Sequence, residues 1–310
     1  MLPSPADGSR SGRSGAVSAA VQTGYMDSGF MAAPVAEAVD SPESRLQDAS
    51  VRAGGCFVRA LPLDKTCSSA ARRFFREAVA GLGLPGDLVH DGITMASELA
   101  ANTLHAQGNV EFSGTRQRAV TGIPEFWLYL RGVGARAEIV CKIFDSEPGW
   151  SVDAQEQPNK APLEQVGGRG LQVVAALSAG QWGGHPSRGR LGAWKVPGKA
   201  VWFALRIPPS AEAARYGRRE LDPAHAIDEL EAMLADRGLG GRIVRADEPA
   251  ADISVLSISR HLTVWRHGKT ISWRTPGGEY QQMEVVDLVD VAEQIICAHE
   301  EAAQADPMVV

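Results

Sequence analysis

Two periods of hydrophobic and polar residues follow one another along the chain, and each predicts a type of secondary structure. Residues 56–63 alternate with a period of two and are expected to form a strand. Thr66 or Ser68 then offers an N-cap for a helix. Glycine and proline after residue 80 end this helix, and a second helix is expected over residues 86–106. The apolar face of the first helix consists of Ala70, Phe74, Phe75, Ala78, Val79 and Leu82.

The middle of the chain predicts a hairpin, a polar loop and a short helix. Strands are expected over residues 125–131 and 137–144, joined by a turn over residues 132–136. Residues 146–168 contain several prolines and glycines and are expected to form a loop. A helix over residues 170–179 and strands over residues 181–185 and 200–207 follow. Helices packed on one face of a mixed, mainly antiparallel sheet give an α/β sandwich.

The C-terminal part predicts a small α-β-β-β-β-α unit. Amphipathic helices are expected over residues 224–237 and 286–301. Between them, strands are expected over residues 241–246, 253–258, 262–266 and 270–274. Trp265 and Trp273 lie on the last two strands. They could form a recognition face, but as alternating strand residues they are more simply core.

Composition divides the chain into four parts and favours the α+β class. Residues 1–53 are rich in Ser, Gly, Ala and Pro and are expected to form a disordered tail. Residues 54–208 are expected to form the first domain and residues 209–221 a linker. Residues 222–304 are expected to form a small second domain, whose role the sequence does not indicate.

Charge and cysteine content restrict the function. The 310 residues carry a formal net charge of −6, and we find no sustained run of Lys and Arg, which argues against direct nucleic-acid binding. The four cysteines lack metal-ligand spacing and are typical of reduced thiols. We find neither a signal peptide nor an apolar stretch long enough to cross a membrane, so we expect the protein to be located in the cytoplasm.

Glu98 and Asn102 carry the first candidate chemistry. They are four residues apart on the second expected helix, so their side chains would project from one face, one turn apart. A carboxylate accepts a proton or orients water, and an amide oxygen is a hard ligand for magnesium. Alone, this spacing is more typical of a solvated helix face.

Asp145 and a glycine-rich segment supply two further elements. Asp145 follows an apolar strand, where its carboxylate could accept a hydrogen bond from an adenine amino group. The other interpretation is a turn-initiating Asp beside Pro and Gly. The segment Gly167, Gly168, Arg169 and Gly170 opens a helix, where close backbone approach and free N–H groups suit anionic phosphate.

In this order and spacing, the three elements resemble the ATP-binding domain of the GHKL, or Bergerat, superfamily. Gyrase-type topoisomerases, sensor histidine kinases and anti-sigma-factor serine kinases share this domain. SELAANTLHA at residues 97–106 is similar to the SELVTNAVRHA form of the stand-alone, histidine-kinase-like anti-sigma branch in actinobacteria. GGRGLQVV, WG and GKAVWFAL, which begin at residues 167, 182 and 198, strengthen the match. The resemblance covers about half of the chain and implies a Bergerat-type α/β sandwich.

The resemblance implies a role for each matching residue, with ATP and Mg²⁺ as cofactors. Glu98 corresponds to the general base and Asn102 to the magnesium ligand. Asp145 corresponds to the aspartate that reads adenine, and Gly149 completes its turn. The residues implied near the phosphates are Gly168, Arg169, Gly170, Leu171 and His105. For His105, a structural role is the other interpretation.

Two positions depart from the superfamily pattern. Glu147 stands where the first glycine of an Asp-x-Gly-x-Gly box would be. The loop expected to close over the nucleotide contains no clear basic residue besides Lys160 that could hold the phosphates. The pattern therefore favours nucleotide binding and leaves phosphoryl transfer open.

The implied function is an ATP-binding cytoplasmic regulator of transcription. It would be a serine/threonine kinase that phosphorylates an anti-anti-sigma (STAS-type) partner and sequesters a sigma factor, and a homodimer is compatible with this function. The alternative is a non-catalytic, nucleotide-gated interaction module. The catalytic half of a histidine kinase is a weaker hypothesis, because no long helix with a phospho-acceptor His precedes residue 54. An interaction module in the C-terminal part is a further hypothesis.

Overall fold

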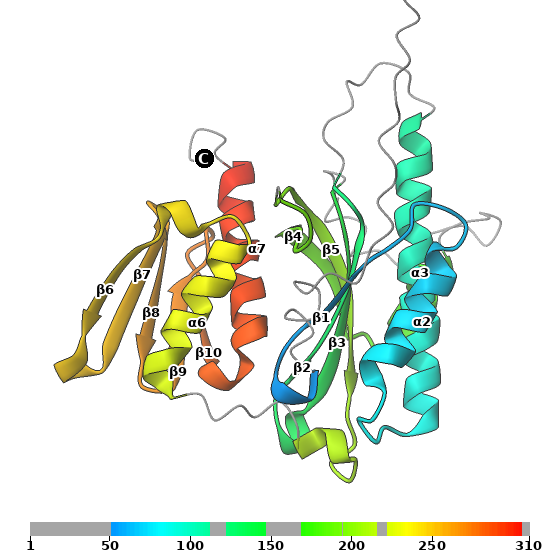
Figure 1. Ribbon diagram of the computed structural model, residues 1–310, viewed down its shortest axis with the longest axis horizontal. Coiled ribbons are helices and arrows are strands. Elements are labelled where there is room, and N and C mark those ends of the chain that lie inside the picture. Colours follow the sequence, from blue (N-terminus) through cyan, green and yellow to red (C-terminus); the bar gives the residue numbers. More distant parts are fainter. Residues whose placement is uncertain (1–50, 112–121, 147–168, 194, 216–221, 306–310) are drawn as a thin grey trace, which may run out of the picture. The chain divides into compact units, whose positions relative to one another are not determined.

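The computed structural model describes residues 51–111, 122–146, 169–193, 195–215 and 222–305, all within the compact unit Asp40–Val310. This described part contains five α-helices and two five-stranded sheets, so the predicted α+β class is confirmed (Figure 1). Of the expected tail (1–53), loop (146–168) and linker (209–221), residues 1–50, 147–168 and 216–221 lie outside the described residues. The short helical turns Val51–Ala53 and Glu212–Arg215 pack on the first core through Val51, Ala213 and Ala214, so these parts of the expected tail and linker belong to the first domain.

The first sheet is antiparallel in all its described strand pairs, so the prediction of a mixed, mainly antiparallel sheet is correct for its main direction and wrong for the parallel part. Its central strand is β3, in which Cys141 lies between Leu128 and Phe203 of the neighbouring strands. The strands in spatial order are β1 (Phe57–Ala60), β2 (Glu125–Arg131), β3 (Glu138–Asp145), β5 (Pro197–Arg206) and β4 (Trp182–Arg188).

Three helices cover one face of this sheet, namely α2 (Cys67–Val79), α3 (Gly86–Glu111) and α5 (Arg169–Leu177). Figure 1 shows α2 and α3 side by side along the sheet. Gly92 lets the two helices approach, because a β-carbon there would lie 2.0 Å from the Phe75 ring. That ring also stacks on Phe203, with 6.3 Å between centroids. The periodicity of the α2 sequence therefore fixes the face that packs on the sheet.

The start of α2 differs in detail from the expected cap. Thr66 occupies the N-cap position, but its side chain makes no capping hydrogen bond. Its hydroxyl and backbone N–H both donate to the carboxylate of Asp64 instead. A residue type that often caps helices is here part of the preceding turn.

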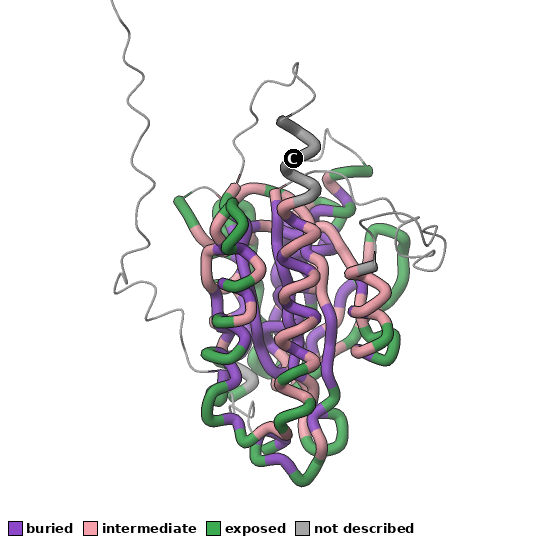
Figure 2. Tube along the Cα trace, turned by 90° about the vertical axis from the view of Figure 1, so that its right-hand side faces the viewer, coloured by how far each residue is buried: buried purple, intermediate pink, exposed green. Residues whose placement is uncertain are grey.

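The opposite face of the first sheet is also buried. Trp127 and Phe144 stack on this face, with 5.4 Å between centroids. Val289 and Met233 from the C-terminal part belong to the same apolar cluster. Figure 2 shows the buried residues concentrated along the strands between the helices. The first sheet therefore has a helix-bearing face and a face covered by the C-terminal part.

The second sheet contains one strand more than the predicted α-β-β-β-β-α unit. The additional strand, β10, pairs with β9 from Tyr280 to Glu284. The hydrophobic periodicity did not predict this strand, because its residues are mostly polar and every second one is exposed. The elements are α6 (Pro223–Asp236), β6 (Val244–Glu248), β7 (Ile253–Ser259), β8 (Leu262–His267), β9 (Thr270–Arg274), β10 (Tyr280–Glu284) and α7 (Leu288–Ala305).

The two tryptophans of this sheet lie on opposite faces. Trp273 pairs with Val264 and is 2% exposed, within the core formed with α6 and α7. Trp265 pairs with Ser272 and is 42% exposed. The interpretation of both residues as core is therefore correct for Trp273 and wrong for Trp265, because successive side chains of a strand alternate between faces.

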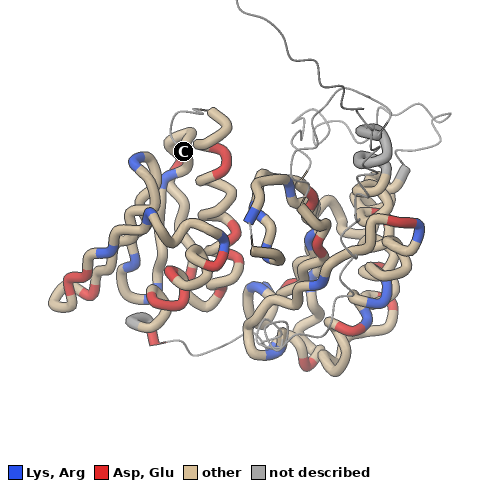
Figure 3. The backbone as a smooth tube through the Cα atoms, turned by 45° about the horizontal axis from the view of Figure 1, so that its top comes forward, with Lys and Arg blue, Asp and Glu red and all other residues tan. Residues whose placement is uncertain are grey.

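Other features agree with simple expectations. All four cysteines are buried free thiols. None of the described helices is both long and apolar enough to cross a membrane. Figure 3 shows basic and acidic residues interspersed over the described backbone.

Candidate functional site

Helix α3 positions Glu98 and Asn102. Both side chains are half-buried, whereas Met95 and Leu99 on the neighbouring side of the helix lie in the first core. Helix α2 holds this part of α3 by polar contacts, since the Arg72 guanidinium donates to the Ser97 hydroxyl over 2.8 Å. The residue just before Glu98 is thus fixed by a neighbouring helix.

The start of α5 lies directly against these two side chains. A β-carbon on Gly170 would come within 2.7 Å of Oε2 of Glu98 and 3.6 Å of Oδ1 of Asn102. A larger residue at this position would therefore have to displace the Glu98 carboxylate. The structure therefore brings together two of the three sequence elements, which are 68 to 72 residues apart along the chain.

Asn102 has an unsatisfied polar atom at this contact. Its amide nitrogen Nδ2 is buried and has no hydrogen-bond partner in the described part of the chain. Buried amide groups are usually paired, so an orphaned one needs an explanation. Since the two ends of an amide are assigned from their surroundings, either atom can be turned towards a ligand.

Asp145 ends β3 on the helix-bearing face. It continues the row of Cys141 and Ile143, whose side chains lie in the first core. Its carboxylate is 2% exposed and lies 3.3 Å from Nζ of Lys199 on β5. A buried carboxylate is thus held in place by the strand beside it.

The other predicted residues are placed in part. Leu171 is partly buried and packs against the first core. The backbone of His105 lies in α3, and that of Arg169 begins α5. Gly149 and Gly168 lie outside the described residues, as do Glu147 and Lys160.

The described ranges were searched for clusters of side chains that could ligate a metal ion. They contain no group of three or more His, Cys, Asp or Glu residues that could hold a metal ion.

Sequence reasoning did not identify a second polar cluster, on the other face of the first sheet. Its centre is Glu293 of α7, which is 0% exposed. Although burial raises the pKa of Glu293, the charges of Arg237, Lys142 and Arg190 hold it well below its usual range. The acidic residues at regular spacing in the α7 sequence were the available signal for this cluster.

Comparisons of the chain with models of protein families, with curated protein sequences and with solved structures find no match. The site is therefore interpreted from its own residues. These are a carboxylate and an orphaned amide on one helix, packed against the glycine-bearing N-terminus of another.

Proposed function

We propose that the protein binds ATP and Mg²⁺ at the contact between α3 and α5, within a Bergerat-type sandwich. The observation that supports this most directly is the approach of Gly170 to Glu98 and Asn102. A helix N-terminus presents backbone N–H groups that the helix itself leaves unpaired, and its dipole favours anions. Phosphate oxygens beside Gly170 would thus meet donors of α5 and the amide of Asn102 at once.

The residues fit a magnesium ion bound together with phosphates. Asn102 would supply its amide oxygen to the ion, and its Nδ2 has no hydrogen-bond partner among the described residues. Magnesium in nucleotide sites is commonly held by one or two protein oxygens, with phosphate and water completing the octahedron. When bound, the ion would neutralise phosphate charge next to the reacting group.

Asp145 is proposed to read the adenine amino group. It lies on the same sheet face as the helices that carry the phosphate site. Lys199, 3.3 Å from the Asp145 oxygen Oδ1, would orient the carboxylate. An ionised carboxylate accepts the amino hydrogen of adenine and repels the carbonyl oxygen that guanine has at the same position.

The proposed activity is protein serine kinase activity of the anti-sigma-factor type. The hydroxyl oxygen of a serine attacks the γ-phosphorus, the bond to ADP breaks, and Glu98 accepts the hydroxyl proton. The substrate would be an anti-anti-sigma protein of the STAS type. Binding of a sigma factor in the absence of that partner would make the protein a regulator of transcription in the cytoplasm.

Phosphorylation of candidate STAS-type proteins tests this activity. Wild type and Glu98→Gln are incubated with Mg²⁺ and ATP, and phosphoserine is measured by mass spectrometry. We expect phosphoserine with wild type and its loss with Glu98→Gln at unchanged ATP affinity. ATP binding by wild type without transfer to any candidate would favour the non-catalytic, nucleotide-gated module. Equal transfer by both proteins would exclude the role given to Glu98.

A further inference from the structure

Helix α7 has two buried faces of opposite character. The apolar face packs in the core of the second sheet and consists of Leu288, Val291, Ala292, Ile295 and Ile296. The other face carries Asp290, Glu293 and Glu300, which are all buried. Their spacing of three and seven residues places these acids on one side of the helix. Helix α7 is therefore an acidic amphipathic helix.

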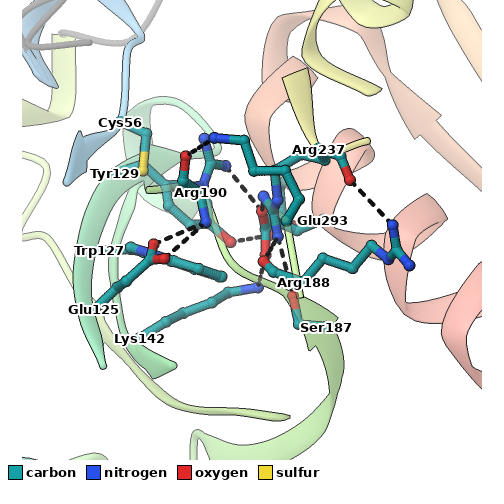
Figure 4. Close-up of polar contacts among 12 residues, drawn as sticks. Cys56, Glu125, Trp127, Tyr129, Lys142, Ser187, Arg188, Arg190, Arg237 and Glu293 are labelled. Atoms are coloured by element: carbon teal, nitrogen blue, oxygen red, sulfur yellow. Dashed lines mark hydrogen bonds and ion pairs between the residues drawn. The ribbon is translucent and has the colours of Figure 1, made fainter. Parts of the chain in front are cut away.

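The acidic side of α7 meets a basic surface on the first sheet. We call this surface, formed by Arg131, Lys142, Arg188 and Arg190, the basic sheet face. Figure 4 shows Lys142, Arg188 and Arg190 together with Trp127 and Tyr129. Strands β2, β3 and β4 and the residues just after β4 supply it. The ion pairs across the contact are Arg131 with Asp290 (3.4 Å), Lys142 (3.4 Å) and Arg190 (2.8 Å) with Glu293, and Arg188 with Glu300.

Aromatic rings hold the cations of the basic sheet face in position. The Arg190 guanidinium carbon lies 5.3 Å from the Trp127 ring centroid, and Lys142 Nζ lies 5.7 Å from that of Tyr129. Glu125 accepts hydrogen bonds from the indole N–H of Trp127 and the backbone N–H of Arg190, both over 2.8 Å. The face is thus organised by the first sheet itself.

Three cations surround the one carboxylate of Glu293. Lys142 and Arg190 of the basic sheet face pair with it, and so does Arg237, which follows α6 in the C-terminal part. The Nε atoms of Arg190 and Arg237 are buried and have no hydrogen-bond partner in the described part. Buried ion pairs stabilise less than apolar packing of the same volume, and unpaired buried donors add a cost. The ion pairs of α7 with the basic sheet face therefore stabilise this contact less than apolar packing would.

We propose that the basic sheet face is a docking surface for acidic amphipathic helices. Helix α7 occupies it as an intramolecular ligand, and an acidic helix of a protein partner displaces α7. Charge complementarity selects this kind of partner, because each of the three acids of α7 already pairs with a cation of the face. The proposal does not depend on nucleotide binding, since the basic sheet face lies on the side of the sheet opposite α3 and α5.

A fluorescent peptide with the sequence of residues 285–305 is the probe for this surface, and the full chain is the receptor. In wild type, α7 competes with the peptide, so we expect weak binding. Glu293→Lys places a cation among Lys142, Arg190 and Arg237 and should release α7. We therefore expect the peptide to bind this variant at least about tenfold more tightly than wild type, as measured by fluorescence anisotropy.

The matched control is Glu293→Lys combined with Lys142→Glu. This exchange restores an ion pair within the chain and removes a cation from the face, so the tighter peptide binding should be lost. Glu300→Lys, at the Arg188 pair, serves as a second variant if circular dichroism shows that Glu293→Lys does not fold. Peptide affinity equal to wild type in a folded single variant would overturn the proposal, and so would tight binding that survives Lys142→Glu.

Discussion

Gly170 at the start of α5 lies against the carboxylate of Glu98 on α3, so that a β-carbon on Gly170 would come within 2.7 Å of Oε2. The contact joins two helices beside Asn102, whose amide nitrogen has no hydrogen-bond partner in the part of the chain that the structure describes. Each of these features would be costly or unexplained by itself. Together they mark a small polar contact between α3 and α5, which is where we propose that the nucleotide binds.

Gly170→Ala should weaken ATP binding. The added methyl group must push the Glu98 carboxylate away and would occupy the space proposed for phosphate. We expect at least about a tenfold loss of affinity, equivalent to about 1.4 kcal/mol. Gly86→Ala is the matched control, because a β-carbon at this first residue of α3 meets nothing within 4 Å. Equal affinities of the two variants, measured by calorimetry, would contradict this assignment.

Asp145→Asn should reduce discrimination between ATP and GTP. The substitution keeps the shape of the side chain but replaces an acceptor oxygen by a donor, so guanine would no longer be repelled. We expect the ratio of the two dissociation constants to fall about tenfold, mainly through weaker ATP binding. An unchanged ratio in a folded variant would show that Asp145 pairs with Lys199 for structural reasons alone.

Much of the fold could be predicted from local patterns. The spacing of Phe74 and Phe75 gave the buried face of α2, and the apolar run after Gly122 gave β2. Two strand patterns also indicated β8 and β9, which a turn at Gly268 with a φ of +57° joins. These elements were predictable because each depends on residues close together in the sequence.

The contacts between distant elements could not be predicted in this way. The strand β10 is polar and exposed, so its pairing with β9 is the main cause of its structure. Likewise, the ion pair of Lys142 with Glu293 joins residues 151 positions apart. The order Glu98, Asn102 and Gly170 suggested a common site only through a resemblance, because spacing along the chain does not give a distance in space.

Protonation of His185 should destabilise the protein as the pH falls. Burial lowers the pKa of His185 from 6.5 to about 4, and the charge of Lys142, 3.0 Å away, also lowers it. The folded protein therefore binds fewer protons than the unfolded chain between these values. The stabilising effect is complete above pH 6.5 and is lost as the pH falls towards 4, by up to about 3 kcal/mol.

Urea unfolding between pH 7.5 and pH 5, chosen to lie on either side of about pH 6.5, measures this effect. Glu293 stays ionised throughout this interval, because its pKa is held well below 4.5. The control is His185→Gln, which keeps an acceptor for Lys142 but does not titrate. A pH dependence of the same slope in both proteins would exclude His185 as its source.

The two tryptophans of the second sheet should differ in their effect on stability. Trp273→Ala removes a large side chain from the core and should lower the free energy of unfolding by about 3–5 kcal/mol. Trp265→Ala changes a residue that is 42% exposed and should cost about 1 kcal/mol or less. Chemical denaturation of both variants measures this difference, and similar losses would contradict the assigned faces.

Calorimetric titration of ATP into the full chain, with and without Mg²⁺, tests the central claim most directly. Wild type is compared with Asn102→Ala, which removes the side-chain amide whose Oδ1 would lie 3.6 Å from a β-carbon on Gly170. We predict ATP binding that is strengthened by Mg²⁺ in wild type, with this dependence on Mg²⁺ lost in the variant. Absence of ATP binding by wild type, or an identical response of the two proteins to Mg²⁺, would contradict the proposed nucleotide site.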